Sequence, residues 1–234
     1  MVSWFAKGAE GEKFVEEQEE KRKSAGGNDN VRNWRFKLGY DSSGYIVPLD
    51  DLTFFFNEHQ FQANGSYYNY ETCIQDVEGE CPLCENGNRF APVGVMSIID
   101  LTEYKKKDGT MSKPKKKIMV LKQGGRERWL KRQKKLGGLA FKKFEVTRSR
   151  DKKGEATGTM EDYEKEVDPE ILKQLAPSDV DANEWLKPYN YEELFMPKSA
   201  AELRKLIGIS EPVGSSESGG DYQEPEKKSI KDLI

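Results

Sequence analysis

One histidine and three cysteines have the residue types and the spacing of a metal site. Cys81 and Cys84 are separated by two residues, and such a gap lets both thiolates reach one ion at about 2.3 Å. Cys73 lies eight positions before this pair, and His59 lies fourteen positions earlier again. Because this set uses every cysteine and the single histidine of the chain, it predicts a closed, four-ligand structural zinc site, one ion per chain, rather than an open catalytic one.

Two other interpretations of these residues are compatible with the sequence. The cysteines could be unrelated buried thiols beside a surface histidine, or Cys81 and Cys84 could form a redox pair. Under the zinc interpretation, the surrounding region folds only when the ion is bound. The chain has no glycine-rich phosphate loop and no second histidine for acid–base chemistry. We therefore expect a protein that is not an enzyme.

A strongly basic block is the second feature that indicates a function. Residues 101–150 contain 18 lysines and arginines against 4 acidic residues, a net charge of +14. Residues 1–100 carry a net charge of −8 and residues 151–234 carry −9, so the whole chain has a net charge of −3. Such a concentration of positive charge in one part of the chain indicates a polyanionic partner, most often nucleic acid. The alternative is a solvated lysine-rich face without a partner.

Aromatic residues accompany the cations of this block and of the metal segment. Aromatic rings stack on bases while lysines hold phosphates, which is how single strands are bound without sequence preference. For each ring the alternative is a place in the core, and Trp129, on a basic helix, fits either role. We expect DNA contacts from the following residues: Tyr67, Tyr68, Tyr70, Tyr104, Lys105, Lys106, Lys107, Lys113, Lys115, Lys117, Lys122, Arg126, Arg128, Trp129, Lys131 and Arg132.

The elements that must position these residues are mostly short strands. Alternating or continuous apolar patterns predict strands over residues 34–38, 45–49, 53–61, 93–101, 115–122, 140–150 and 157–163. A helix is predicted over residues 126–136, ended by two glycines, and shorter helices over residues 169–175, 182–186 and 199–207. This mainly β (α+β) pattern favours a small closed barrel with extra elements over a parallel α/β sheet.

Composition divides the chain into three parts. Residues 1–30 form a charged helix and a linker, and residues 31–209 form the core, with a zinc subdomain at about residues 57–92. Residues 210–234 form a tail rich in serine, glycine and glutamate, which we expect to be disordered. The longest apolar runs are far shorter than the roughly 18 residues of a membrane span, and the start lacks the apolar core of a signal peptide. We expect an intracellular protein without membrane contact.

The order of these features resembles a known family. A charged N-terminal helix, residues 54–59, Cys73, the Cys81–Cys84 pair, an apolar strand and a lysine block follow one another as in the zinc-containing single-stranded DNA-binding proteins of tailed bacteriophages. The resemblance implies an OB-fold-like five-stranded barrel with an inserted zinc-binding subdomain and flanking helices. It also implies a cleft between barrel and subdomain that holds the strand.

The resemblance further implies a function and partners. Such a protein coats and protects single-stranded DNA without sequence preference during phage replication, recombination and repair in the host cytoplasm. Residues 21–24 resemble a motif for cooperative self-association, and residues 229–234 resemble a tip that docks replisome or recombination proteins. The alternatives are a zinc-ribbon transcription or RNA-binding factor and a virion adaptor protein.

Overall fold

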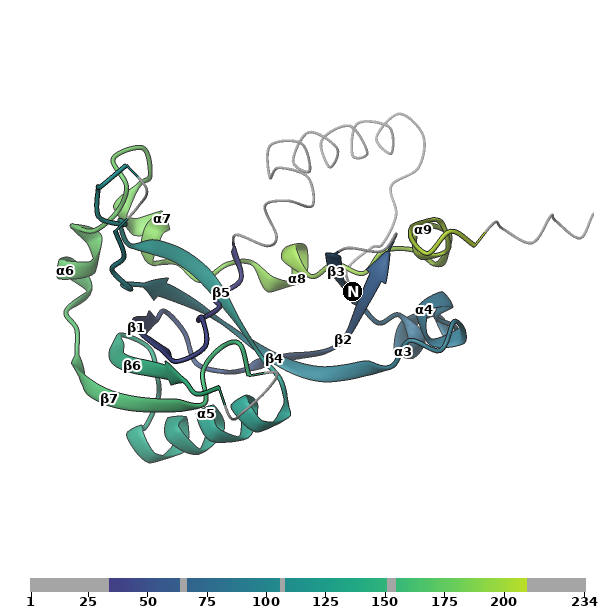
Figure 1. Ribbon diagram of the computed structural model, residues 1–234, viewed down its shortest axis with the longest axis horizontal. Coiled ribbons are helices and arrows are strands. Elements are labelled where there is room, and N and C mark those ends of the chain that lie inside the picture. Colours follow the sequence, from purple (N-terminus) through teal and green to yellow (C-terminus); the bar gives the residue numbers. More distant parts are fainter. Residues whose placement is uncertain (1–33, 64–66, 106–107, 151–154, 210–234) are drawn as a thin grey trace, which may run out of the picture.

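A computed structural model describes residues 34–63, 67–105, 108–150 and 155–209 of the chain (Figure 1). The expected N-terminal helix and linker (1–30) and the expected C-terminal tail (210–234) lie outside these residues. Lys106, Lys107 and the side chain of Tyr67 also lie outside them. Within the described ranges, no helix has the length and apolarity needed to cross a bilayer.

The described strands form one antiparallel sheet. Six of the seven expected strands are confirmed, and the structure adds one strand, β3, that the sequence analysis did not predict. The pairing order is β3-β2-β4-β1-β6-β7, and β5 pairs with β4. The strands are β1 Ser42–Pro48, β2 Phe54–Ala63, β3 Tyr67–Thr72, β4 Phe90–Asp100, β5 Lys115–Leu121, β6 Lys142–Arg148 and β7 Met160–Glu166.

The expected closed five-stranded barrel is wrong, because the sheet is open and has seven strands among the described residues. The long strand β4 explains the difference. Its first half pairs with β2 and its last three residues pair with β1, while β5 follows its other edge. The expected strand at residues 34–38 is not formed either. Instead, the N–H groups of Phe36 and Leu38 donate to the carbonyls of Ile118 and Ala156, so this segment lies between β5 and the residues before β7.

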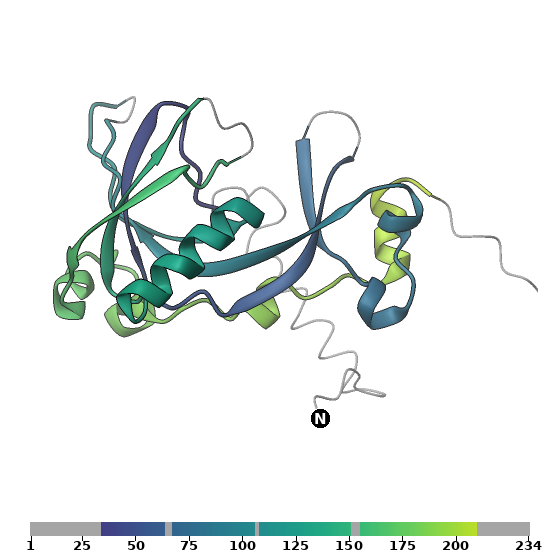
Figure 2. The same ribbon diagram turned by 90° about the horizontal axis from the view of Figure 1, so that it is seen from below.

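One face of the sheet packs against helix α5, Gln123–Leu136, as Figure 2 shows. Trp129 is 1% exposed and meets Phe144 of β6 edge to face, with 4.9 Å between ring centroids. The same core contains Met96, Ile98 and Met119 from the facing strands. The helix ends at Gly137, whose φ of 68° is the left-handed conformation that glycine adopts without strain.

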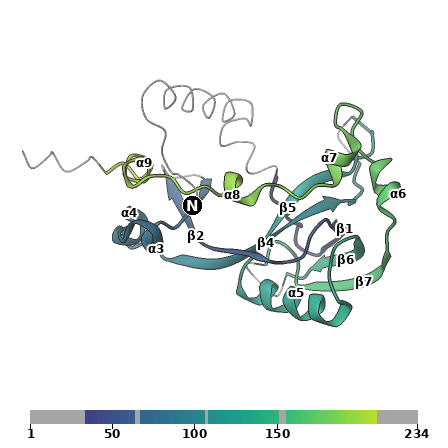
Figure 3. The ribbon, with the colours of Figure 1, turned by 180° about the vertical axis from the view of Figure 1, so that it is seen from behind.

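The remaining helices lie along the other side of the sheet and at one end of the molecule. Helices α6 to α9 run from the body past the hairpin β2–β3 (Figures 1 and 3). Helix α9 packs on α4 through a second core that contains Leu203, Leu83 and Phe61. The helices are α3 Gln75–Glu78, α4 Pro82–Glu85, α6 Pro169–Lys173, α7 Ala182–Leu186, α8 Tyr191–Leu194 and α9 Ala200–Leu206.

Partly buried hydrogen bonds hold the segment around α8 on the sheet. The hydroxyl of Tyr191 donates to Asp50 Oδ2 at 2.7 Å and lies 2.7 Å from Ser97 Oγ. The N–H of Tyr189 donates to the same Ser97 oxygen at 2.9 Å. The chain therefore crosses from the body to the hairpin along a fixed path.

The place of Trp129 in the core gives a prediction about stability. We expect Trp129→Ala to lower the free energy of unfolding by about 3–5 kcal/mol, because it removes a buried ring and leaves a cavity. Leu130→Ala is the matched control on the same helix, since Leu130 is 37% exposed, and should change stability by no more than about 0.5 kcal/mol. Urea denaturation measures both, and equal effects of the two changes would contradict this packing.

Candidate metal centre and nucleic-acid interface

The four predicted metal ligands come together at the end of the molecule that holds α3, α4 and α9. Their ligand atoms all lie within 4.8 Å of one another. His59 Nε2 is 3.4 Å from Cys81 Sγ and 3.6 Å from Cys84 Sγ, and the sulfurs of Cys73 and Cys84 are 3.7 Å apart. Tetrahedral zinc with ordinary bond lengths places two sulfurs about 3.8 Å apart, and a sulfur and a nitrogen about 3.6 Å apart. The donor set and its spacing therefore fit one tetrahedral ion.

Local structure explains how these residues meet. His59 lies in β2, Cys73 directly follows β3, and the hairpin between them returns the chain. Cys81 precedes α4 and Cys84 lies within it. Pro82 occupies the first position of this helix, where proline is favoured, and so sets the helix to begin directly after Cys81. Since His59 is fully buried and in contact with two sulfurs, the interpretation as a surface histidine beside unrelated thiols is wrong.

Hydrogen bonds through Asn88 orient the histidine. The Nδ1 atom of His59 lies 2.9 Å from the carboxamide oxygen of Asn88, whose amide nitrogen donates to the Gln60 carbonyl at 3.3 Å. A carboxamide oxygen only accepts, so Nδ1 carries the proton and the Nε2 lone pair faces the sulfurs. This is the tautomer that a metal ligand needs.

Burial and neighbouring thiols disfavour ionisation of two of the three cysteines, Cys73 and Cys84, when no cation is bound. Burial lowers the pKa of His59 and raises that of Cys73, and burial together with the neighbouring thiol raises the pKa of Cys84 to about 12. Burial also acts to raise the pKa of Cys81, but backbone hydrogen bonds, the strongest from Ile74, outweigh it and lower that pKa. A bound cation must therefore displace protons from thiols, and its affinity must fall as the pH falls.

The opposite face of the hairpin carries a cluster of aromatic and cationic side chains. The Arg35 guanidinium lies 4.0 Å above the Tyr70 ring, and the Lys37 ammonium lies 5.4 Å from the same ring. Beside them, Lys122 donates to Gln60 Oε1 at 2.5 Å, and Gln60 is the cross-strand partner of Tyr70. We call Arg35, Lys37, Tyr70 and Lys122 the hairpin cluster.

A buried ion pair anchors the hairpin cluster. Both terminal nitrogens of Arg35 donate to the Glu58 carboxylate, at 3.0 and 2.5 Å, and both side chains are less than 10% exposed. This paired geometry fixes the guanidinium in one orientation. The pair ties residues 34–38 to β2 and holds the Tyr70 ring against a cation.

Only some of the other residues expected to contact DNA are placed to do so. Tyr68, in β3, is half exposed, and Tyr104, Lys105, Lys113 and Lys115 lie exposed at the β4–β5 connection. Lys131 is exposed on α5. The buried Trp129 cannot stack on a base, so that expectation is wrong.

Four further cations of the expected set are held within the fold. Lys117 pairs with Asp100 at 2.7 Å, and Arg126 donates to the Pro92 carbonyl at 2.6 Å. Arg128 pairs with Glu155 and Glu161, and Arg132 donates to the Glu161 carbonyl. These contacts bind α5 and β5 to their neighbours, so the +14 block is not one continuous surface.

Sequence reasoning missed Arg35, Lys37 and Glu58. The signal was present, because Arg35 and Lys37 alternate with Trp34, Phe36 and Leu38 and so share one face of an extended segment.

Comparison of the chain with models of known protein families and with curated proteins found no match in either.

The metal centre gives a direct prediction. We expect the purified protein to hold one metal ion per chain by elemental analysis, and Cys81→Ser to lose it or bind it at least tenfold more weakly, because one of four ligands is removed. Asp76→Asn is the control, since this neighbouring exposed carboxylate bonds only to Asn57 among the contacts described. Wild-type affinity should fall between pH 7.5 and 5.5. Full occupancy of Cys81→Ser, or a pH-independent affinity, would contradict the assignment.

The buried ion pair gives a second prediction for this site. We expect Glu58→Ala to lower the free energy of unfolding by about 3–5 kcal/mol, because Arg35 would remain buried without its partner. Glu170→Ala breaks the exposed pair with Lys173 and should cost no more than about 0.5 kcal/mol. Denaturation with urea compares the two. A small loss for Glu58→Ala would show that Arg35 finds another partner or reaches water.

Proposed function

We propose that this protein binds single-stranded DNA without sequence preference and coats and protects it during phage DNA replication, recombination and repair. The observation that carries the proposal is the hairpin cluster, in which the Tyr70 ring is held by a buried arginine next to Lys37 and Lys122. Aromatic platforms beside cations are the chemistry of sequence-tolerant single-strand binding. Duplex DNA keeps its bases stacked on one another, so this surface favours separated strands.

A second group of cations indicates the path of the bound DNA strand over the protein. Lys115 begins β5 and Lys122 directly follows it, and seven residues of strand span about 20 Å. We propose that a single strand runs from the hairpin cluster along β5 to Tyr104, Lys105 and Lys113. This path contains Tyr68 at one end and the exposed β4–β5 connection at the other.

The metal and the fold have supporting roles in this proposal. We propose zinc as the ion, because three cysteines and one histidine are a donor set typical of structural zinc. We also propose that the open sheet is an OB-fold-like variant with residues 57–92 as a zinc subdomain. The ion would then hold the hairpin whose other face carries Tyr68 and Tyr70.

Partners and location belong to the same proposal. The protein would act in the host cell cytoplasm, associate cooperatively with further copies on DNA through residues 21–24, and meet replisome or recombination proteins through residues 229–234. No chemical step is assigned to it.

A titration of the zinc-loaded protein tests the proposal. Oligo-dT should bind more tightly than duplex DNA of equal length, with log affinity falling by about 0.7 per phosphate contact for each unit of log salt. Tyr68→Ala should weaken oligo-dT binding by about 1–3 kcal/mol, the energy of one stacked base. Lys122→Ala should reduce the salt slope by about 0.7.

Two matched variants control for general effects of these changes. Tyr40→Ala removes another half-exposed tyrosine held by an arginine, Arg148, and Lys134→Ala removes an exposed lysine of α5. Neither should alter affinity or slope. Equal binding of duplex and oligo-dT would favour a duplex or RNA factor, and no binding by the zinc-loaded chain would favour an adaptor protein.

A further inference from the structure

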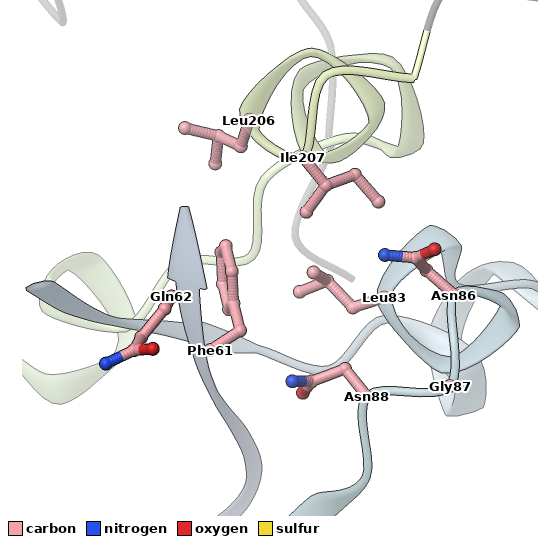
Figure 4. A pocket seen from close by; sticks show the side chains of 8 residues that line it. All are labelled: Phe61, Gln62, Leu83, Asn86, Gly87, Asn88, Leu206 and Ile207. Atoms are coloured by element: carbon pink, nitrogen blue, oxygen red, sulfur yellow. The ribbon is translucent and has the colours of Figure 1, made fainter. Parts of the chain in front are cut away.

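A pocket lies beside the metal centre, between the hairpin, the α4 loop and α9 (Figure 4). Its volume is about 280 Å³, which suits a single ring system better than an extended ligand. One wall is apolar and is made by Phe61, Leu83, Leu206 and Ile207. The other wall and the rim are made by Asn86, Gly87, Asn88 and Gln62.

The chemistry of the lining limits what the pocket can hold. It has no charged side chain, so a phosphate or a carboxylate would find no partner of opposite charge. An apolar side chain would leave carboxamide donors and acceptors unpaired, which costs free energy. A nucleobase satisfies both walls, because its faces are apolar and its edge carries donors and acceptors.

The pocket lies next to a residue of the proposed DNA path. Gln62, at its rim, is the cross-strand partner of Tyr68, and directly opposed side chains on one strand pair are about 5 Å apart at Cβ. Tyr68 lies on the face of the hairpin opposite Phe61, so a DNA strand stacked on Tyr68 reaches the pocket by passing around the edge strand β3. The Asn88 carboxamide already bonds to His59 and the Gln60 carbonyl, so Asn86 and Gln62 are the exposed carboxamides of the lining. The Gln62 side chain points away from Asn86 and the apolar wall (Figure 4), which leaves Asn86 to face a ligand.

We propose that this pocket receives one nucleobase of the bound single strand, with Asn86 reading its edge and the Phe61 wall covering its face. A carboxamide pairs with adenine through two hydrogen bonds, so adenine is the preferred base. The proposal rests on the single-strand binding proposed above and adds a base-reading subsite to it. The protein would then have a modest base preference on top of its sequence-independent binding.

The test compares oligo-dA with oligo-dT of equal length on the zinc-loaded full chain. Asn86→Ala should lower oligo-dA affinity two- to tenfold, the size expected for one or two hydrogen bonds, and should leave the salt slope and oligo-dT affinity unchanged. Leu206→Phe, which fills the pocket from α9, should have the same effect. Asn183→Ala, which removes an exposed carboxamide of α7, is the control and should change neither affinity.

A second readout reports contact directly. The side-chain amide signals of Asn86 in the ¹⁵N NMR spectrum should shift on addition of oligo-dA, and those of Asn183 should not. If wild-type protein binds neither oligonucleotide, the proposed function fails. If it binds both while Asn86→Ala and Leu206→Phe keep the wild-type dA-to-dT ratio and the Asn86 signals do not move, the pocket proposal alone is overturned.

Discussion

The structure depends on the register of strand β2, which carries two adjacent buried polar side chains that need different partners. His59 is fully buried on the side of the three sulfurs, and Glu58, 3% exposed, pairs with Arg35 on the other side. Because side chains of a strand alternate between its faces, a slip of one residue would place Glu58 among the thiols if it went in one direction, or His59 against the guanidinium if it went in the other. Both partners therefore specify the same register.

This register places different groups of side chains on the two faces of the hairpin. Phe61 lies on the same face as His59 and joins the core of α4 and α9, whereas Gln60 and its partner Tyr70 lie with Glu58. The metal centre therefore stabilises one face, and the hairpin cluster forms on the other. The body has its own core around Trp129, and it is joined to the hairpin by β2, β4 and the segment fixed by Tyr191.

The sequence predicted the metal ligands because cysteine spacing is local chemistry and no other cysteine or histidine competes. It also predicted most strands, since apolar patterns are local. It could not predict how β4 divides its edges between β1, β2 and β5, and so it favoured a closed barrel over the open sheet. The charge of residues 101–150 predicted one basic surface, but Arg128 and Arg132 meet Glu161, which lies 33 and 29 residues further along the chain, and this contact forms only when the sheet is built.

The most direct test of this account is removal of the metal with a chelator, followed by oligo-dT titration and hydrogen exchange on the same sample. The account predicts at least a tenfold loss of affinity and faster exchange in β3, while amides of α5 keep their protection, because the two cores are separate. Unchanged affinity after complete metal removal would contradict it. Loss of protection in α5 would contradict the separation of the hairpin from the body.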